Sequence, residues 1–273
     1  MAADSPTEMA GGVTVGEGAE GFPHSSHYPI FVGVGLGLLT VGLVGHLIVL
    51  GLGVIVFGYG TLGWAHEYAV VEYGRGIIPE QKTYRNLGYE SGTVAIGGVI
   101  ISEIVVFGAL FAAYFALESR NGPWPPSGLP SPDLALAIVL SVVLVASGVT
   151  LHWAQANMER GNRRNFWYGL VATVVLGLAF LAGQGYEYSS LVAEGLTPQS
   201  SPFGSAFYAL TGTHGLHVIV GLLLIGAIAV RAGVWGHFGE ERNLMIRTIT
   251  TYWHFVDAVW LFIVVFVYLN LAA

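Results

Sequence analysis

The sequence contains no cysteine and very few charged residues. Without cysteine the chain cannot form a disulfide, a thiolate metal site, an iron–sulfur cluster or a cysteine-bound copper centre. Only 10% of the residues are charged, whereas a soluble domain has about 25%. Because 54% are hydrophobic and the mean hydropathy is +0.66, the polar surface is too small for a soluble protein. We therefore expect an all-α integral membrane protein.

The N-terminal segment has none of the basic residues that targeting peptides need. Residues 1–27 are small, acidic and Gly-rich, with neither Lys nor Arg. A secretory signal has a basic start and an apolar core, and a transit peptide is rich in arginine. We therefore expect 1–27 to be a disordered acidic tail.

Long apolar runs make up the rest of the chain. Residues 29–65 are uncharged for 37 positions, which as one helix would measure roughly 55 Å against a hydrocarbon core of about 30 Å. Two short spans folding near Gly45–His46 fit better. Seven spans result if this run is a hairpin, and six if it is not. The region 28–71 would then hold the first two transmembrane helices and 93–273 the other five, in the runs 93–117, 134–156, 166–188, 205–230 and 245–271.

Basic residues predict how these spans are oriented. Nine of the ten lie in loop regions on one side of the membrane, and only Arg120 lies on the other. Because basic loops remain in the cytoplasm, we expect 72–92 to be a cytoplasmic loop. With seven spans the N-terminus is inside and the C-terminus outside. The nine residues are Arg75, Lys82, Arg85, Arg160, Arg163, Arg164, Arg231, Arg242 and Arg247.

Glu103 is an acid ten residues into an otherwise apolar span. An ionisable group near the bilayer centre costs a few kcal/mol or more, so it faces protein, water or a partner. The sequence favours neither of two interpretations. Glu103 is either a proton-active carboxyl or subunit contact, or a protonated acid that hydrogen-bonds to a neighbouring helix.

Two further pairs of polar residues lie within spans. His214 and His217 are three residues apart and share one face of a helix, but axial haem ligands must come from facing helices. Hydrogen bonding between helices is therefore favoured over metal or haem ligation. His254 and Asp257 also share a face, and such a pair can orient an imidazole for metal binding or proton transfer. A polar clamp to another helix, with His217 or Glu103 as partner, is favoured over that chemistry.

Other polar and aromatic residues lie near the ends of spans. His152 is about two turns from a basic loop, and Glu187 lies near the opposite face of the membrane. Residues in such places are more often interfacial anchors than catalysts. Trp153, Tyr186 and Tyr188 fit an aromatic belt at the interface.

Several motifs together resemble subunit III of the haem–copper respiratory oxidases, from about residue 28 to the C-terminus. The last two helices of that family are similar to TGTHGLHVIVG (211–221) and YWHFVDAVWLFIVVFVYL (252–269). Its third helix, with a membrane glutamate, resembles ISEIVVFGALFAAYF (101–115). Shorter matches are PEQKTYRNLGYESG (79–92), SGVTLHWA (147–154) and GQGYEY (183–188).

This resemblance implies a fold of seven transmembrane helices, a two-helix hairpin apart from a five-helix bundle, with phospholipid in the cleft between them. It implies an accessory, non-catalytic subunit in a prokaryotic plasma membrane. The subunit would dock on subunit I beside subunit II, support proton uptake, and protect the oxygen-reducing site from inactivation during turnover. Haem and copper are expected on the partner subunits, and no cofactor or metal on this chain. The long form favours a cytochrome c oxidase over a quinol oxidase.

The resemblance also implies roles for individual residues. Glu103 matches the carbodiimide-reactive carboxyl of the family, and no catalytic residue is expected. Residues that link helices or contact subunits and lipid are expected at His152, Glu187, His214, His217, His254 and Asp257. Contacts with lipid or the interface are expected at Trp153, Trp253 and Trp260. The end of the second helix departs from the family pattern, so Trp64, His66 and Glu67 are only substitutes for its lipid-contacting residues.

Two other classes of protein compete with this interpretation. In an independent proton channel or transporter, Glu103, His254 and Asp257 would form a relay. Against it, transporter folds have internal repeats, and none is evident here. In a membrane cytochrome, His214, His217 and His254 would ligate haem, which a Soret band from the isolated chain would reveal.

Overall fold

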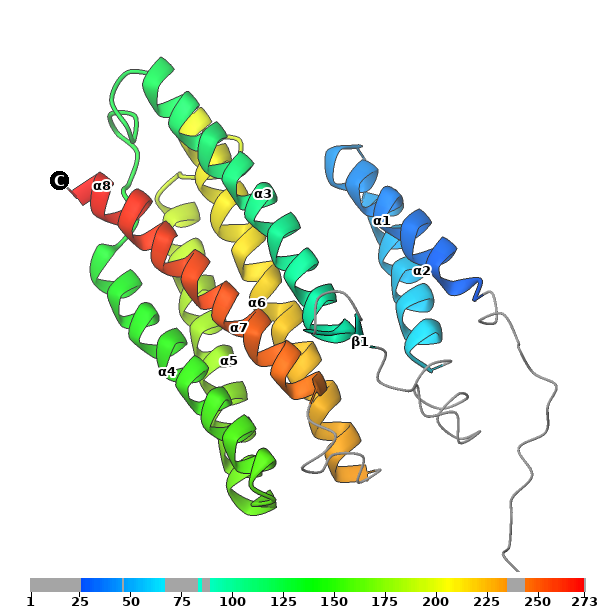
Figure 1. Ribbon diagram of the computed structural model, residues 1–273. Coiled ribbons are helices and arrows are strands. Elements are labelled where there is room, and N and C mark those ends of the chain that lie inside the picture. The colour runs from blue at the N-terminus through cyan, green and yellow to red at the C-terminus, as the bar shows by residue number, and fades with distance from the viewer. Residues whose placement is uncertain (1–25, 46, 67–82, 85–88, 235–243, 273) are drawn as a thin grey trace, which may run out of the picture. The chain divides into compact units, whose positions relative to one another are not determined.

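The computed structural model describes residues 26–45, 47–66, 83–84, 89–234 and 244–272 (Figure 1). The chain divides into two compact units, Met1–Glu80 and Gln81–Ala273. Trp64 and His66 belong to the last turn of a helix in the first unit, whereas Glu67 lies outside the described residues.

The first unit contains two apolar helices that pack against each other, α1 (Tyr28–Gly45) and α2 (Leu47–His66). Glycines allow this packing to be close. A Cβ at Gly35 would collide with the backbone of Phe57, and one at Gly53 with the backbone of Leu39. Small residues let membrane helices approach in this way. The uncharged run 29–65 therefore forms two helices rather than one.

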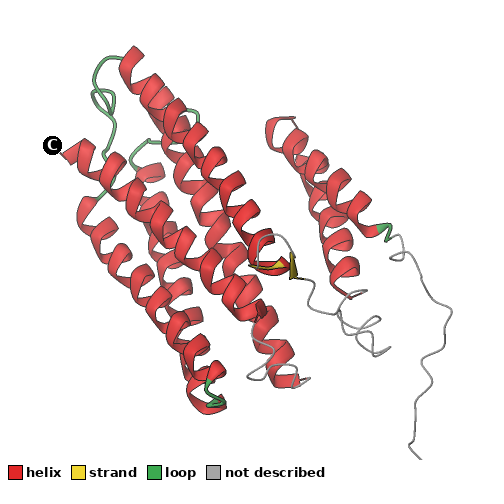
Figure 2. Cartoon of the chain, in the orientation of Figure 1, coloured by secondary structure: helices red, strands yellow, loops and turns green. Residues whose placement is uncertain are grey.

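The second unit is a bundle of long helices, drawn in red in Figure 2. A two-residue antiparallel pair, β1 (Thr83–Tyr84) and β2 (Tyr89–Glu90), precedes them. The last helix continues through a π-helical turn, η2 (Val264–Tyr268), into α8 (Leu269–Ala272). The five long helices are α3 (Ser91–Arg120), α4 (Leu134–Glu159), α5 (Arg163–Ala193), α6 (Pro202–Val234) and α7 (Leu244–Ile263).

These five helices are each long and apolar enough to cross a membrane, which confirms the five long spans expected in this region. In the described residues the apolar stretches of α1 and α2, Tyr28–Leu39 and Gly51–Gly63, are shorter. The spans of the bundle are Ile96–Arg120, Leu134–Glu159, Arg163–Ala193, Pro202–Val230 and Met245–Leu271.

Local side-chain chemistry determines where α4 and α5 begin. Asp133 caps α4, because its carboxylate accepts hydrogen bonds from the backbone N–H of Ala135 (2.8 Å) and Leu136 (3.2 Å). Asn162 caps α5 in the same way, through the N–H of Asn165. Between the two helices Gly161 adopts a positive φ of 70°, which glycine tolerates. A tight α4–α5 hairpin results.

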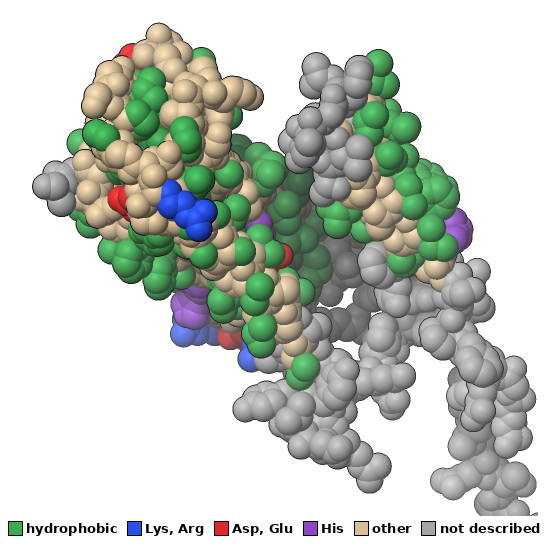
Figure 3. All heavy atoms as spheres, turned by 90° about the horizontal axis from the view of Figure 1, so that it is seen from above, with side chains coloured by type: hydrophobic (Ala, Val, Ile, Leu, Met, Phe, Trp, Pro, Cys, Tyr) green, Lys and Arg blue, Asp and Glu red, His purple; other side chains and the backbone are tan. Residues whose placement is uncertain are grey.

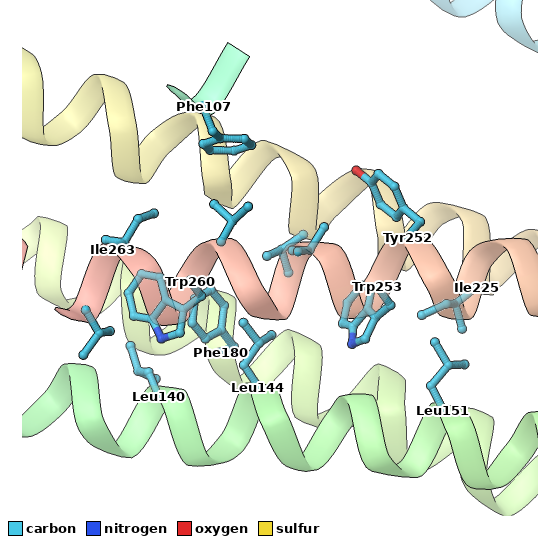
Figure 4. Close-up of a cluster of buried hydrophobic side chains, with 14 of the residues drawn as sticks. Phe107, Leu140, Leu144, Leu151, Phe180, Ile225, Tyr252, Trp253, Trp260 and Ile263 are labelled. Carbon is cyan, nitrogen blue, oxygen red and sulfur yellow. The ribbon is translucent and has the colours of Figure 1, made fainter. Parts of the chain in front are cut away.

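The core of the bundle surrounds α7, which contacts α3, α4 and α6. Trp253 and Trp260 extend from α7 toward α4, where they pack against leucines that include Leu144 and Leu151 (Figure 4). Both tryptophans are completely buried. Many exposed side chains of the helices are large and apolar, and the face drawn in Figure 3 has few charged side chains, as expected for a surface in contact with lipid or another membrane protein.

Candidate functional site: polar groups inside the bundle

Glu103 on α3 and His217 on α6 form a polar pair within the membrane-spanning bundle. Glu103 Oε2 lies 3.0 Å from His217 Nε2. The side chains are only 25% and 18% exposed, respectively. The acid that the sequence leaves without a basic neighbour in its own helix therefore has a histidine partner 114 residues away along the chain.

The second nitrogen of His217 determines how protons are arranged in this pair. Nδ1 lies 2.8 Å from the backbone carbonyl oxygen of Thr213. A carbonyl can only accept a hydrogen bond, so Nδ1 carries a proton. Nε2 then either accepts a proton from neutral Glu103 or donates one to the carboxylate. In both forms one proton lies between the two side chains, and the pair has no net charge.

Aromatic groups enclose the pair and link it to α7. The Phe107 ring centroid is 5.0 Å from that of His217. The Tyr252 hydroxyl of α7 donates to the His217 backbone oxygen at 3.2 Å. The pair therefore connects α3 and α6, and α7 is fastened at the same point.

His254 and Asp257 form a second polar group, on the side of α7 that faces α4. His254 Nδ1 is 3.6 Å from Asp257 Oδ2, and the His152 ring centroid is 6.1 Å from that of His254. Asp257 lies directly over Gly148 of α4, where a Cβ would collide with its carboxylate. The group therefore packs closely against α4, and the one polar contact given for it, between His254 and Asp257, lies within α7. The expectation that His217 or Glu103 would be its partner is wrong, because those two residues pair with each other.

The two neighbouring histidines of α6 have different surroundings. His217 forms the interhelical hydrogen bond, whereas His214 is buried between aromatic rings of α5 and α7. Its ring stacks on Trp260 at a centroid distance of 5.2 Å and meets Phe180 edge-on at 5.7 Å. Neither ring nitrogen of His214 has a hydrogen-bond partner among the described residues. The expected hydrogen bonding between helices therefore holds for His217, and His214 contributes aromatic packing.

Glu187 is buried, and its carboxylate connects helices as expected for a helix-linking residue. It is 3% exposed. Its carboxylate accepts hydrogen bonds from the Tyr268 hydroxyl (2.7 Å), the Gln184 amide (2.8 Å) and the backbone N–H of Asp133 (3.1 Å). The network joins α5 to η2 and to the start of α4. Tyr186 and Trp153 are exposed, and their place at the membrane interface stays a prediction.

Trp253 and Trp260 differ from expectation, because they lie in the core instead of facing lipid. The indole N–H of Trp253 donates to Ser147 Oγ at 2.9 Å, and that of Trp260 donates to Ser141 Oγ at 3.0 Å. Sequence reasoning missed both serines. Trp253 and Trp260 are seven residues apart and share one face of α7, whereas the six-residue spacing of the two serines does not place them on one face of α4 and gives no comparable signal.

The chemical capacity of these groups is to fasten helices and to hold a proton. In the described ranges no group of three or more His, Asp or Glu residues is arranged to hold a metal ion. The pairs Glu103–His217 and His254–Asp257 both bring a histidine to a carboxylate in a membrane-spanning region. The class of protein is therefore a multi-pass helical membrane protein in which polar side chains connect the helices.

Comparison with known proteins identifies the family within this class. The model of the family described as "Cytochrome c oxidase subunit III" matches residues 24–271. The chain belongs to this family. The chain is 40% identical over 172 residues to "Cytochrome c oxidase subunit 3" of Synechocystis sp. The aligned residues make up 62% of this chain and 72% of that protein.

Two other relatives agree with this assignment. "Cytochrome c oxidase subunit 3" of Emericella nidulans is 32% identical over 265 residues, which is 89% of this chain and 91% of that protein. "Probable cytochrome c oxidase subunit 3" of Nocardia farcinica is 41% identical over 175 residues, 62% of this chain and 83% of that protein. The chain is thus an accessory subunit of a respiratory oxidase complex and associates with other oxidase subunits.

Proposed function

We propose that this chain is a non-redox subunit that docks on catalytic subunit I of a cytochrome c oxidase, beside subunit II. In that place it binds phospholipid, supports proton uptake and protects the catalytic subunit from inactivation during turnover. The observation that carries the proposal is that histidines of the membrane-spanning helices contact other side chains of the same chain. His217 bonds to Glu103, His214 stacks on Trp260, and His254 lies against Asp257. Contacts within the chain therefore account for these three histidines without haem, and we place haem and copper on the partner subunits.

We further propose that α1 and α2 both cross the membrane, which gives seven spans. They contain 18 and 20 residues, or roughly 27 and 30 Å at 1.5 Å per residue, close to the hydrocarbon thickness of about 30 Å. The α4–α5 turn, which includes Arg160, Arg163 and Arg164, then lies in the cytoplasm, as does the loop 72–92. The C-terminus is outside, and the tail 1–27 is inside. We place the chain in a prokaryotic plasma membrane.

The Glu103–His217 pair supports a role in proton handling. Because the pair holds its proton without net charge, the cost of keeping it in the bilayer is small compared with that of a lone carboxylate. A protonated carboxyl in an apolar setting is also the form that reacts with a hydrophobic carbodiimide. We therefore propose Glu103 as the carbodiimide-reactive group of this chain.

Co-isolation from native membranes tests the central proposal. An affinity tag on this chain should retain the haem–copper catalytic subunit, and the complex should oxidise reduced cytochrome c. The separated chain should have no Soret band. Failure to retain any haem–copper subunit would contradict the proposal, and a Soret band from the separated chain would contradict its non-redox character.

The same preparation discriminates between the remaining alternatives. A complex that oxidises quinol and not cytochrome c would identify the chain as a quinol oxidase subunit. Proton flux into liposomes that contain this chain alone would favour an independent channel, for which Glu103 would be the first residue to substitute.

A further inference from the structure

The α4–α7 face exposes two histidines in the membrane-spanning region. The side chain of His254 is 47% exposed, and His152 beside it is also exposed. Their exposed neighbours on the same face, Val149 of α4 and Leu261 of α7, are apolar. Two imidazoles are therefore presented on a surface that is otherwise suited to hydrocarbon.

Both histidines lie deeper than the membrane interface. His152 is seven residues before the end of the 26-residue helix α4, or about 10 Å from it at 1.5 Å per residue. A helix of about 39 Å centred on a hydrocarbon core of about 30 Å extends by only about 5 Å at each end. His254, nine residues into the 27-residue span Met245–Leu271, is deeper still, at about 14 Å.

Lipid chains cannot hydrogen-bond to these groups, so something else must cover them. One oxygen of the neighbouring Asp257 carboxylate also lacks a hydrogen-bond partner. Asp257 is 7% exposed, and its Oδ1 has no hydrogen-bond partner within the described part of the chain. The face therefore requires a hydrogen-bond donor for Asp257 and a polar neighbour for the two imidazoles.

The described outer residues of α3 and α5 differ from this face. Exposed residues of α5 such as Val171 and Val175, and of α3 such as Ile104 and Val105, are apolar and suit lipid. The Glu103–His217 pair is partly exposed, but its two members satisfy each other at 3.0 Å.

We infer that the α4–α7 face around His152 and His254 is where the catalytic subunit docks. This inference rests on the proposed function, because it names the surface that the proposed partner uses. The occupant is a membrane helix of that subunit. At the depth of the histidines it presents a hydroxyl, amide or protonated carboxyl that donates to Asp257 or pairs with an imidazole.

Site-specific photocrosslinking in the assembled oxidase tests this face. A benzophenone-bearing amino acid replaces Val149 or Leu261, which are 63% and 43% exposed and adjoin the histidines without removing them. Matched controls carry it at Val105 of α3 and Val175 of α5, which are 67% and 59% exposed. We expect a crosslinked band that contains both subunits when the probe is at position 149 or 261. We expect no such band when it is at 105 or 175.

The outcomes separate this inference from the proposed function. If the catalytic subunit co-purifies but crosslinks only at 105 or 175, or nowhere, the docking face is wrong and the proposed function stands. If it never co-purifies, both are overturned. As a second measurement, the double variant His152→Leu, His254→Leu should retain several-fold less catalytic subunit than the control His27→Leu. Equal retention would contradict the inference.

Discussion

At the scale of single residues, the proton between Glu103 and His217 governs which substitutions the pair tolerates. His217 Nδ1 is bonded to the Thr213 carbonyl, which leaves Nε2 as the atom that faces Glu103. A neutral side chain that donates to Nε2 can therefore replace the acid, and an apolar one cannot.

We predict that the Glu103→Gln variant folds almost normally. A hydrophobic carbodiimide should no longer label it at position 103. The glutamine amide can donate to His217 Nε2, so the free energy of unfolding should change by less than about 0.6 kcal/mol, a typical hydrogen bond between membrane helices. Denaturant titration of the purified chain measures this. The matched variant Glu103→Leu leaves Nε2 unpaired and should cost about 1–3 kcal/mol. Equal destabilisation by Gln and Leu would show that the pair is ionised instead.

A second residue-scale prediction concerns Gly148, which makes room for the Asp257 carboxylate. Gly148→Ala should displace Asp257 and His254 and cost about 1–3 kcal/mol of stability, as overpacking does. Gly185→Ala on α5 is the control, because no atom lies within 4 Å of the added methyl group. It should be neutral or stabilising by up to about 1 kcal/mol, since Ala favours a helix over Gly. Thermal unfolding of the two variants compares them, and an equal effect would argue against the tight Asp257 contact.

At the scale of elements, two hydrogen bonds from buried tryptophans hold α7 to α4. The two tryptophans are two helical turns apart on α7. Trp253 donates to Ser147, and Trp260 donates to Ser141. Ser147 is completely buried, so its bond with Trp253 forms where lipid and water are excluded, whereas the bond between Trp260 and Ser141 is partly buried. Packing and hydrogen bonding therefore act together along this contact.

We predict that the double variant Ser141→Ala, Ser147→Ala lowers the free energy of unfolding by roughly 1–3 kcal/mol, from two interhelical bonds of about 0.6–1.7 kcal/mol each. Ser102→Ala is the control, because the Ser102 hydroxyl is exposed and bonds only within its own helix, to the Val99 oxygen. Denaturant titration of both should separate them clearly. If the double variant matched the control, packing alone would hold α7 to α4.

At the scale of the whole molecule, the long helices of the bundle and the Asp133 cap could be predicted from the sequence. Both depend on local properties, namely the length of an apolar run and a carboxylate beside free N–H groups at a helix start. The pairing of Glu103 with His217 could not be predicted, because it depends on which helices become neighbours. The interior positions of Trp253 and Trp260 were missed for another reason. In a membrane protein both the core and the outer surface are apolar, so hydropathy does not distinguish them.

We propose above all that this chain supports an oxidase without carrying its chemistry. The test is to compare the oxidase with and without the chain and to measure the initial rate of oxygen consumption and its decay during sustained turnover. When the chain is absent, we expect the haem content to be unchanged, the initial rate to be largely preserved, and the activity to decay sooner. Identical decay with and without the chain, or loss of haem together with the chain, would contradict this proposal.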